Sequence, residues 1–228
     1  MMKRTKKELL PSIGTLPEEL LTEVLARVGS SAVTDLFNVK KSCKGFYKAG
    51  EDREVLRRVS LEKLPAVPWE DSYREFIRQC EDRGNPEALF KRGMVEYFSS
   101  KNQVLGIEFL KKATCLGHEE AAYMLGLILL CTNHPSKSQA LEILKKLEQG
   151  SPSTKIQKWR KRSKEIIREM WTSTGSLPQP EPMCTSLFCK RNGSNSGWLS
   201  EEDVEPPSCE ACKWDQEIFF IRNVLQAI

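Results

Sequence analysis

Four cysteines near the end of the chain have the residue type and the spacing of a structural metal site. They form two close pairs, with four and two residues inside the pairs and nineteen between them: Cys184, Cys189, Cys209 and Cys212. Four thiolates arranged in two pairs can surround a tetrahedral Zn²⁺ ion. The spacing leaves two alternatives open, one structural zinc or four free thiols in a partly disordered tail, and we expect no cofactor to be required.

Other chemistry is poorly supported by the residue patterns. No strand-to-helix context of the thioredoxin type surrounds Cys212, which argues against a redox role. The sequence contains no Gly-x-Ser-x-Gly, no phosphate-binding glycine loop and no His-Glu-x-x-His, and its 2 histidines leave few general bases. We expect no enzymatic activity. The remaining cysteines lie singly in apolar, helix-like segments, as core residues do: Cys43, Cys80, Cys115 and Cys131.

Composition indicates a globular intracellular protein. The 228 residues are 39% hydrophobic and 29% charged, with a net charge of +4. The longest apolar stretch, residues 121–131, is shorter than the roughly eighteen residues that a membrane span needs. The basic amino terminus lacks the apolar run of a secretory signal. We expect a soluble protein of the cytoplasm or nucleus with no membrane partner, in which disulfides do not form.

Helices must position these cysteines, because apolar residues recur at spacings of three and four along most of the chain. The first such pattern runs from Leu16 to Val28, and Gly29 is predicted to end that helix. A second helix follows as far as Cys43, residues 45–47 are predicted to bend the chain, and a third helix covers residues 52–59. Three short helices form too small a core to be stable without a partner or a second domain.

An internal repeat follows a proline-containing linker at residues 61–71. Residues 84–93 align with residues 117–126 at a constant offset of 33, with Gly, Glu, Ala and the final Gly identical. A period in the low thirties with paired helices is typical of a helical solenoid. Its second half recurs one residue out of register, at residues 110–113 and 144–147. The small residues would let helices approach closely, at Ala88, Gly93, Ala121 and Gly126.

Residues 153–171 form a basic amphipathic helix in this pattern. Residues 155–170 carry seven basic and two acidic side chains, whereas residues 175–228 carry four basic and eight acidic ones. The apolar spacing of Ile156, Trp159 and Ile166 favours a capping helix with a solvated charged face. The alternative is a nucleic-acid contact made by residues 155–168. The tail beyond is polar and ends in an apolar segment, residues 218–225, that fits a short helix or a strand.

The first helical segment carries a family resemblance. Leu-Pro-Glu-Glu-Leu-Leu-Thr-Glu-Val-Leu-Ala-Arg-Val at residues 16–28 and Val-Lys-Lys-Ser-Cys-Lys-Gly-Phe-Tyr at residues 39–47 resemble an F-box, although Phe46 stands where that family often has Trp. The resemblance implies binding to the Skp adaptor and, through it, to a cullin-RING ubiquitin ligase. Carried over by position, the implied adaptor contacts are Leu16, Pro17, Leu20, Leu25, Val39 and Cys43.

The second resemblance covers residues 84–147, which look like Sel-like or tetratricopeptide-type helical repeats. The succession of F-box and repeats resembles a plant family of F-box proteins, whose members also end in a Cys-rich tail with a Cys-x-x-Cys-x-Trp-Asp run, here residues 209–215. A related group carries a MYND zinc finger at this end. The further cysteines and the terminal histidine of that finger are missing in this chain.

Together these patterns predict an all-α chain with a three-helix F-box, a short α-α repeat unit and a largely irregular C-terminal tail. We expect a non-catalytic substrate receptor of a Skp–cullin–F-box type E3 ubiquitin ligase that recruits a protein target through its repeats. The alternatives are a nuclear nucleic-acid-associated protein and an interaction module with a degenerate F-box. The predicted parts are a leader at 1–15, the F-box at 16–60, the linker at 61–71, the repeat domain with its basic capping helix at 72–172, and the Cys-containing acidic tail at 173–228.

Overall fold

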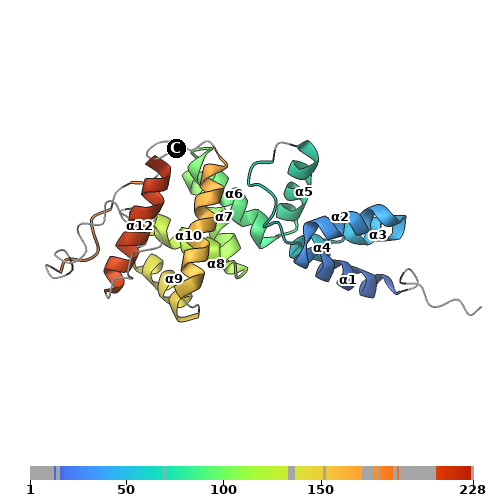
Figure 1. Cartoon of the computed structure of the whole chain (residues 1–228), viewed down its shortest axis with the longest axis horizontal. Helices are drawn as coiled ribbons and strands as arrows, with labels where there is room; N and C mark the ends of the chain where they lie inside the picture. Colours follow the sequence, from blue (N-terminus) through green and yellow to red (C-terminus); the bar gives the residue numbers. More distant parts are fainter. Residues whose placement is uncertain are drawn as a thin grey trace, which may run out of the picture. The chain divides into compact units, whose positions relative to one another are not determined.

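The computed structural model of the chain is helical wherever it has regular secondary structure, within the residues that it describes (Figure 1). This confirms the all-α prediction. None of the described helices combines the length and the hydropathy that crossing a membrane requires. The described residues are 13, 16–68, 70–132, 137–150, 153–170, 177–178, 180–186, 189 and 209–226. The predicted leader, apart from Ile13, and residues 190–208 of the predicted tail lie outside them.

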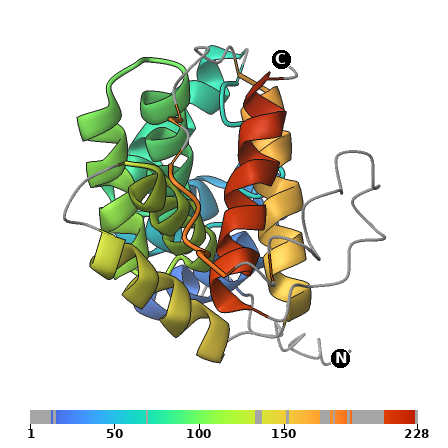
Figure 2. The same cartoon turned by 90° about the vertical axis from the view of Figure 1, so that its left-hand side faces the viewer.

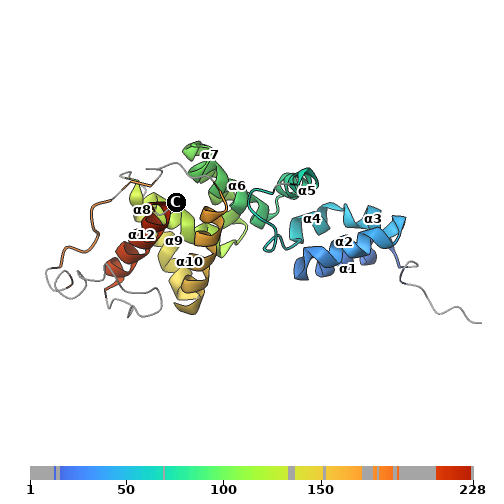
Figure 3. The ribbon, with the colours of Figure 1, turned by 45° about the horizontal axis from the view of Figure 1, so that its top comes forward.

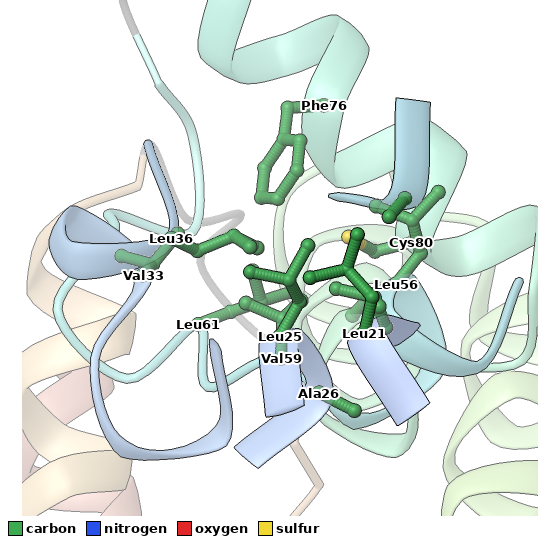
Figure 4. Packing of buried hydrophobic residues seen from close by; sticks show 13 residues of the cluster. Leu21, Leu25, Ala26, Val33, Leu36, Leu56, Val59, Leu61, Phe76 and Cys80 are labelled. Carbon is green, nitrogen blue, oxygen red and sulfur yellow. The ribbon is translucent and has the colours of Figure 1, made fainter. Parts of the chain in front are cut away.

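The chain divides after Ala88 into two compact units. In the first unit, α1 contacts α2, α3 and α4 (Figure 3). Buried side chains from several helices converge, among them Leu25, Leu36 and Phe76 (Figure 4). The helices of this unit are α1 (Glu18–Ser31), α2 (Val33–Ser42), α3 (Lys44–Gly50), α4 (Arg53–Arg58) and α5 (Asp71–Asp82).

The predicted F-box segment contains four helices rather than three. The predicted bend at residues 45–47 was wrong, because these residues lie inside α3. The chain breaks at Cys43 instead, whose backbone is extended at φ −159° and ψ 162°. The Cys43 sulfur accepts a hydrogen bond from the Phe46 N–H at 3.4 Å, so this side chain caps the new helix.

Gly29 also differs from its predicted role, because α1 continues past it to Ser31. A side chain here would crowd the core: a Cβ atom would lie 3.2 Å from Leu36 Cδ2 and 3.4 Å from Val59 Cγ2. Gly29 therefore lets Leu36 and Val59 pack closely against α1, and it does not end the helix.

The first core extends beyond the predicted end of the F-box at residue 60. Leu61, in the predicted linker, is fully buried in the first core, and Phe76 and Cys80 of α5 belong to the same cluster. The Phe37 ring meets the Phe76 ring edge-on, with 4.9 Å between centroids. The first core therefore includes the linker and α5, which enlarges a bundle that would be small on its own.

In the second unit, α8 (Glu119–Cys131) is the central helix. Every residue from Glu120 to Cys131 is buried, and α8 contacts α7, α9, α10 and α12 (Figure 2). Such a helix is apolar on all sides, as expected for one enclosed by others. The unit contains the rest of α6 (Pro86–Phe98) together with α7 (Gln103–Cys115), α9 (Lys137–Gly150), α10 (Ser153–Arg168) and α12 (Glu210–Gln226).

The predicted repeat is present in the helices. Both bounds of α6 recur in α8 at an offset of 33, from 86 to 119 and from 98 to 131. Gly84 and Gly117, at the same offset, have φ of +74° and +85°, a left-handed conformation that favours glycine after a helix. Asn85 and His118 follow them and cap the next helices, accepting hydrogen bonds from the N–H groups of Ala88 and Ala121.

The end of the chain belongs to the second unit. The apolar segment predicted as helix or strand lies within α12, a helix of 17 residues whose buried face includes Trp214, Ile218 and Ile221. This helix contacts α8 and lies beside α10 (Figure 2). The described part of the predicted tail is therefore irregular at residues 177–178 and 180–186 and ends in the packed helix α12.

Candidate functional site

The first candidate surface lies at the start of α1. Leu16 and Leu20 are 37% and 54% exposed, and Pro17 between them is exposed too. Leu21 and Leu25 of α1 are buried, whereas Leu20 is exposed near the start of the helix and follows the exposed Leu16 and Pro17. Exposed apolar side chains that lie together on a helix are typical of a protein contact.

Helix α3 lies beside this surface and carries an exposed aromatic residue of its own. Lys48 of α3 forms an ion pair with Glu18 of α1 at 3.1 Å, which holds α3 beside the start of α1 (Figure 3). Tyr47, the neighbour of Lys48, is 57% exposed. The Lys40 ammonium lies 5.2 Å from the centre of the Tyr47 ring. We call the surface formed by Leu16, Pro17 and Leu20, beside which Lys48 of α3 pairs with Glu18, the α1–α3 face.

The six residues implied as adaptor contacts have different environments. Leu16, Pro17 and Leu20 lie on the α1–α3 face, and Cys43 is exposed at the junction of α2 and α3. Val39 is half-buried against the core, and Leu25 is only 1% exposed. The expectation for Leu25 is corrected here: its side chain is enclosed by its own bundle and has no surface to offer a partner.

The exposure of Tyr47 was not predicted, although a signal was present. Phe46 and Tyr47 are adjacent, and neighbouring residues on a helix point about 100° apart, so both rings cannot face one core. Phe46 packs against the core and Tyr47 faces solvent.

The second candidate site is the cysteine cluster of the second unit. The sulfur atoms of Cys184, Cys189, Cys209 and Cys212 all lie within 4.8 Å of one another. The Cys184 and Cys209 sulfurs are 3.9 Å apart. The structure thus brings together all four residues predicted from spacing, from the segment before α12 and from the first turn of α12 itself.

Two residues of the Cys-x-x-Cys-x-Trp-Asp run, Trp214 and Asp215, position the cysteine pairs relative to each other. The Asp215 carboxylate accepts hydrogen bonds from the backbone N–H groups of Met183 at 3.0 Å and Cys184 at 3.1 Å. Trp214, next to it, is 1% exposed in the core. The Cys-x-x-Cys-x-Trp-Asp run therefore supplies two sulfurs, an anchor in the core, and a carboxylate that fastens the segment carrying a third sulfur.

The sulfurs of the cluster influence one another electrostatically. Backbone N–H groups of Cys212 and Ala211 bond to the Cys209 sulfur and lower the pKa of that thiol. The pKa of Cys212 is raised well above the usual range, first by its hydrogen bond with Cys184 and then by burial. The pKa of Cys189 is raised mainly by its own bond with Cys184.

The basic helix α10 packs against its neighbours. Ile156, Trp159 and Ile166 are each no more than 6% exposed, as the spacing predicted. Arg160 forms an ion pair with the buried Glu217 of α12, and Arg162 forms one with the buried Glu120 of α8 at 2.9 Å. Several basic side chains are thus engaged inside the second unit, which favours the capping interpretation over the nucleic-acid one.

Comparisons with known proteins agree with this architecture. Residues 61–168 match the protein family described as plant tetratrico peptide repeats. A putative F-box protein of Arabidopsis thaliana is 30% identical over 225 residues, covering 93% of this chain and 76% of that protein. A second F-box protein of Arabidopsis thaliana is 29% identical over 117 residues, 51% of this chain and 72% of its own length. A third is 30% identical over 128 residues, 54% of this chain and 33% of its own length. No solved structure matches the chain significantly.

Proposed function

We infer that this chain, which belongs to the plant F-box proteins, is a substrate-receptor subunit of a Skp–cullin–F-box type E3 ubiquitin ligase. Its α1–α3 face would bind the Skp adaptor, and the helical repeats of the second unit would recruit a protein target. Such a subunit performs no chemistry. It raises the effective concentration of the target near the ubiquitin-loaded partner.

The observation that carries this proposal is the exposed apolar start of α1. Leu16 and Leu20 remain in solvent although the same helix buries Leu21 and Leu25 in a complete core. Covering apolar side chains of this size with a partner removes them from water and is favourable by about 25 cal/mol for each Å² buried. An adaptor that presents an apolar helical surface would supply that cover.

Co-purification tests the proposal. The full chain should co-purify with a plant Skp adaptor, and Leu16→Ala combined with Pro17→Ala should abolish this. Both side chains are exposed, so the folded far-ultraviolet circular dichroism spectrum should persist in the double variant. Equal recovery of the adaptor by the double variant would exclude this surface. A wild-type chain that retains no adaptor would favour the degenerate F-box alternative.

The ion pairs made by α10 argue against the nucleic-acid alternative. Arg160 and Arg162 were two of the basic side chains on which it rested, and both are ion-paired with buried carboxylates. Moving them to phosphate would leave Glu217 and Glu120 buried without those partners, at a cost that such contacts would have to exceed.

A further inference from the structure

We propose that Cys184, Cys189, Cys209 and Cys212 bind one Zn²⁺ ion that fastens the segment before α12 to the start of that helix. The geometry of the sulfurs fits this ion. A tetrahedral site with Zn–S bonds of about 2.3 Å has sulfur–sulfur edges of about 3.8 Å. The Cys184–Cys209 distance is 3.9 Å, and all four sulfurs lie within 4.8 Å of one another. Small side-chain rotations would complete the tetrahedron.

The surroundings fit a closed structural site rather than a catalytic one. All four ligands come from the protein, so no coordination position remains for water or substrate. As zinc binds, each thiol loses its proton to solvent and the four S–H bonds are replaced by four Zn–S bonds. The resulting site carries a net charge of −2 at the first turn of α12, where the helix dipole is positive and N–H groups already bond to Cys209.

Asp215 is the positioning residue of this site. Its carboxylate accepts hydrogen bonds from the backbone N–H groups of Met183 and Cys184. It thereby fixes the segment that carries Cys184 to the start of α12, where Cys209 and Cys212 lie. Groups that orient ligands in this way commonly change metal affinity by about 10- to 100-fold when they are removed.

The metal would also determine how firmly α12 packs. Helix α12 places Trp214, Glu217 and Ile221 against the rest of the second unit, and Glu217 accepts a hydrogen bond from Tyr123 of α8 at 2.7 Å. Cys209 and Cys212 lie at the first turn of the same helix. Zinc would tie this end of α12 to the preceding segment, so the bound ion would slow the local opening of the whole helix.

Metal content is the direct test. The full chain, purified under reducing conditions with added Zn²⁺, should contain close to one zinc per chain, and Cys184→Ser with Cys212→Ser should contain almost none. Cys115→Ser is the matched control, because this cysteine is exposed in the same unit and lies outside the cluster. With Co²⁺ in place of zinc, the wild-type chain should show the visible absorption of a tetrahedral thiolate site.

Two further measurements separate metal binding from a merely structural role of these residues. Chelator competition should show about 10- to 100-fold weaker zinc affinity in Asp215→Ala and unchanged affinity in Glu210→Gln, an exposed acid at the start of the same helix. Removal of zinc from the wild-type chain should speed hydrogen exchange in residues 210–226 while residues 86–98 keep their protection.

A wild-type chain without zinc above the level of the double serine variant would overturn the proposal. So would a Cys184–Cys209 disulfide in the reduced preparation, seen as a mass lower by two hydrogen atoms. A Co²⁺ spectrum unchanged by the loss of Cys184 and Cys212 would overturn it as well. None of these outcomes depends on adaptor binding, which resides in the first unit.

Discussion

Gly126 of α8 lies so close to Leu144 of α9 that a Cβ atom at Gly126 would be 2.6 Å from both Cγ and Cδ2 of that leucine. The same contact occurs one repeat earlier, where a Cβ atom at Gly93 would be 2.8 Å from Leu110 Cγ. Leu144 and Leu110 are both fully buried. The repeat thus stacks its helices through a glycine that accepts a leucine, and the sequence period has a direct packing cause.

Gly126→Ala should destabilise the chain. The added methyl group overpacks a buried contact, which typically costs about 1–3 kcal/mol and outweighs the roughly 1 kcal/mol that alanine gains in helix propensity. Urea unfolding of the two proteins measures the difference. Gly150→Ala, at the last residue of α9, is the control and should not destabilise, because no described atom beyond its chain neighbours and its own helix backbone lies within 4 Å of the added Cβ.

The contact can also be tested by coupling. Gly126→Ala combined with Leu144→Ala should lose less stability than the sum of the two single changes, because the second change makes room for the first. Additive effects would mean that the two residues do not meet as described.

Asn85 should be far more important than an ordinary helix cap. Its side-chain oxygen accepts hydrogen bonds from the N–H groups of Glu87 and Ala88. Its amide nitrogen donates hydrogen bonds to the carbonyl oxygens of Leu56 and Val59, both at 2.9 Å. Asn85→Ala would remove the cap and leave two carbonyls without this donor, a loss of about 3 kcal/mol in the free energy of unfolding.

The matched control for Asn85 is another asparagine cap. Asn102 accepts the Leu105 N–H at 3.3 Å at an exposed helix start, and Asn102→Ala should cost about 1 kcal/mol, as caps usually do. Thermal or urea unfolding compares the two variants. Equal losses would contradict the role assigned to the inward-donating amide of Asn85.

Arg160→Ala should be strongly destabilising, because it leaves the buried Glu217 without its guanidinium partner. Removing one member of a buried ion pair typically costs about 3–5 kcal/mol, although Tyr123 would still donate to this carboxylate. Replacing both members, by Arg160→Met and Glu217→Leu, should cost less than Arg160→Ala alone. Lys146→Ala breaks an exposed pair with Glu142 and should leave the unfolding midpoint unchanged. A larger loss in the double variant would contradict this account.

The native chain should protect two of its cysteines from alkylation. Burial raises the pKa of Cys80 and of Cys131 from 9.0 to about 12, so these thiols stay protonated and unreactive at neutral and mildly alkaline pH. Iodoacetamide at pH about 8 should modify the exposed Cys43 and Cys115 first, as peptide mass spectrometry would show. In urea, all four should react at similar rates. Fast native labelling of Cys80 or Cys131 would show that these cores open readily.

The same pKa shift has a consequence for stability. In the unfolded chain these thiols lose their protons near pH 9.0, whereas in the folded chain they keep them to about pH 12. Their contribution is complete below about pH 9 and is lost as the pH rises toward about 12. The free energy of unfolding should therefore fall over that interval.

Local patterns predicted much of this fold. The Gly-Asn-Pro-Glu-Ala and Gly-His-Glu-Glu-Ala segments define helix ends through glycine conformation and capping, which involve only neighbouring residues. They account for where α6 and α8 begin, at Pro86 and Glu119. The four-cysteine cluster was also predictable, because two short spacings fix each pair and only the meeting of the pairs required the fold.

Features that depend on distant residues could not be predicted. Leu20 and Leu25 have the same side chain, and only the positions of α2, α3 and α4 determine that one is exposed and the other buried. Helix α12 packs on α8 through contacts such as Glu217 with Tyr123, which are 94 residues apart. No local sequence pattern predicts such a contact, so the packing of α12 in the second unit could not be predicted.

Adaptor affinity of a charged variant tests the central claim most directly. Isothermal titration of a purified plant Skp adaptor into the full chain should give the same Kd for the wild type and for Val104→Asp, which alters a 72% exposed apolar residue of the second unit. Leu16→Asp with Leu20→Asp would place two carboxylates in the proposed apolar contact and should weaken binding by at least about 100-fold. An unchanged Kd for this folded double variant would contradict the assignment of the α1–α3 face as the adaptor surface.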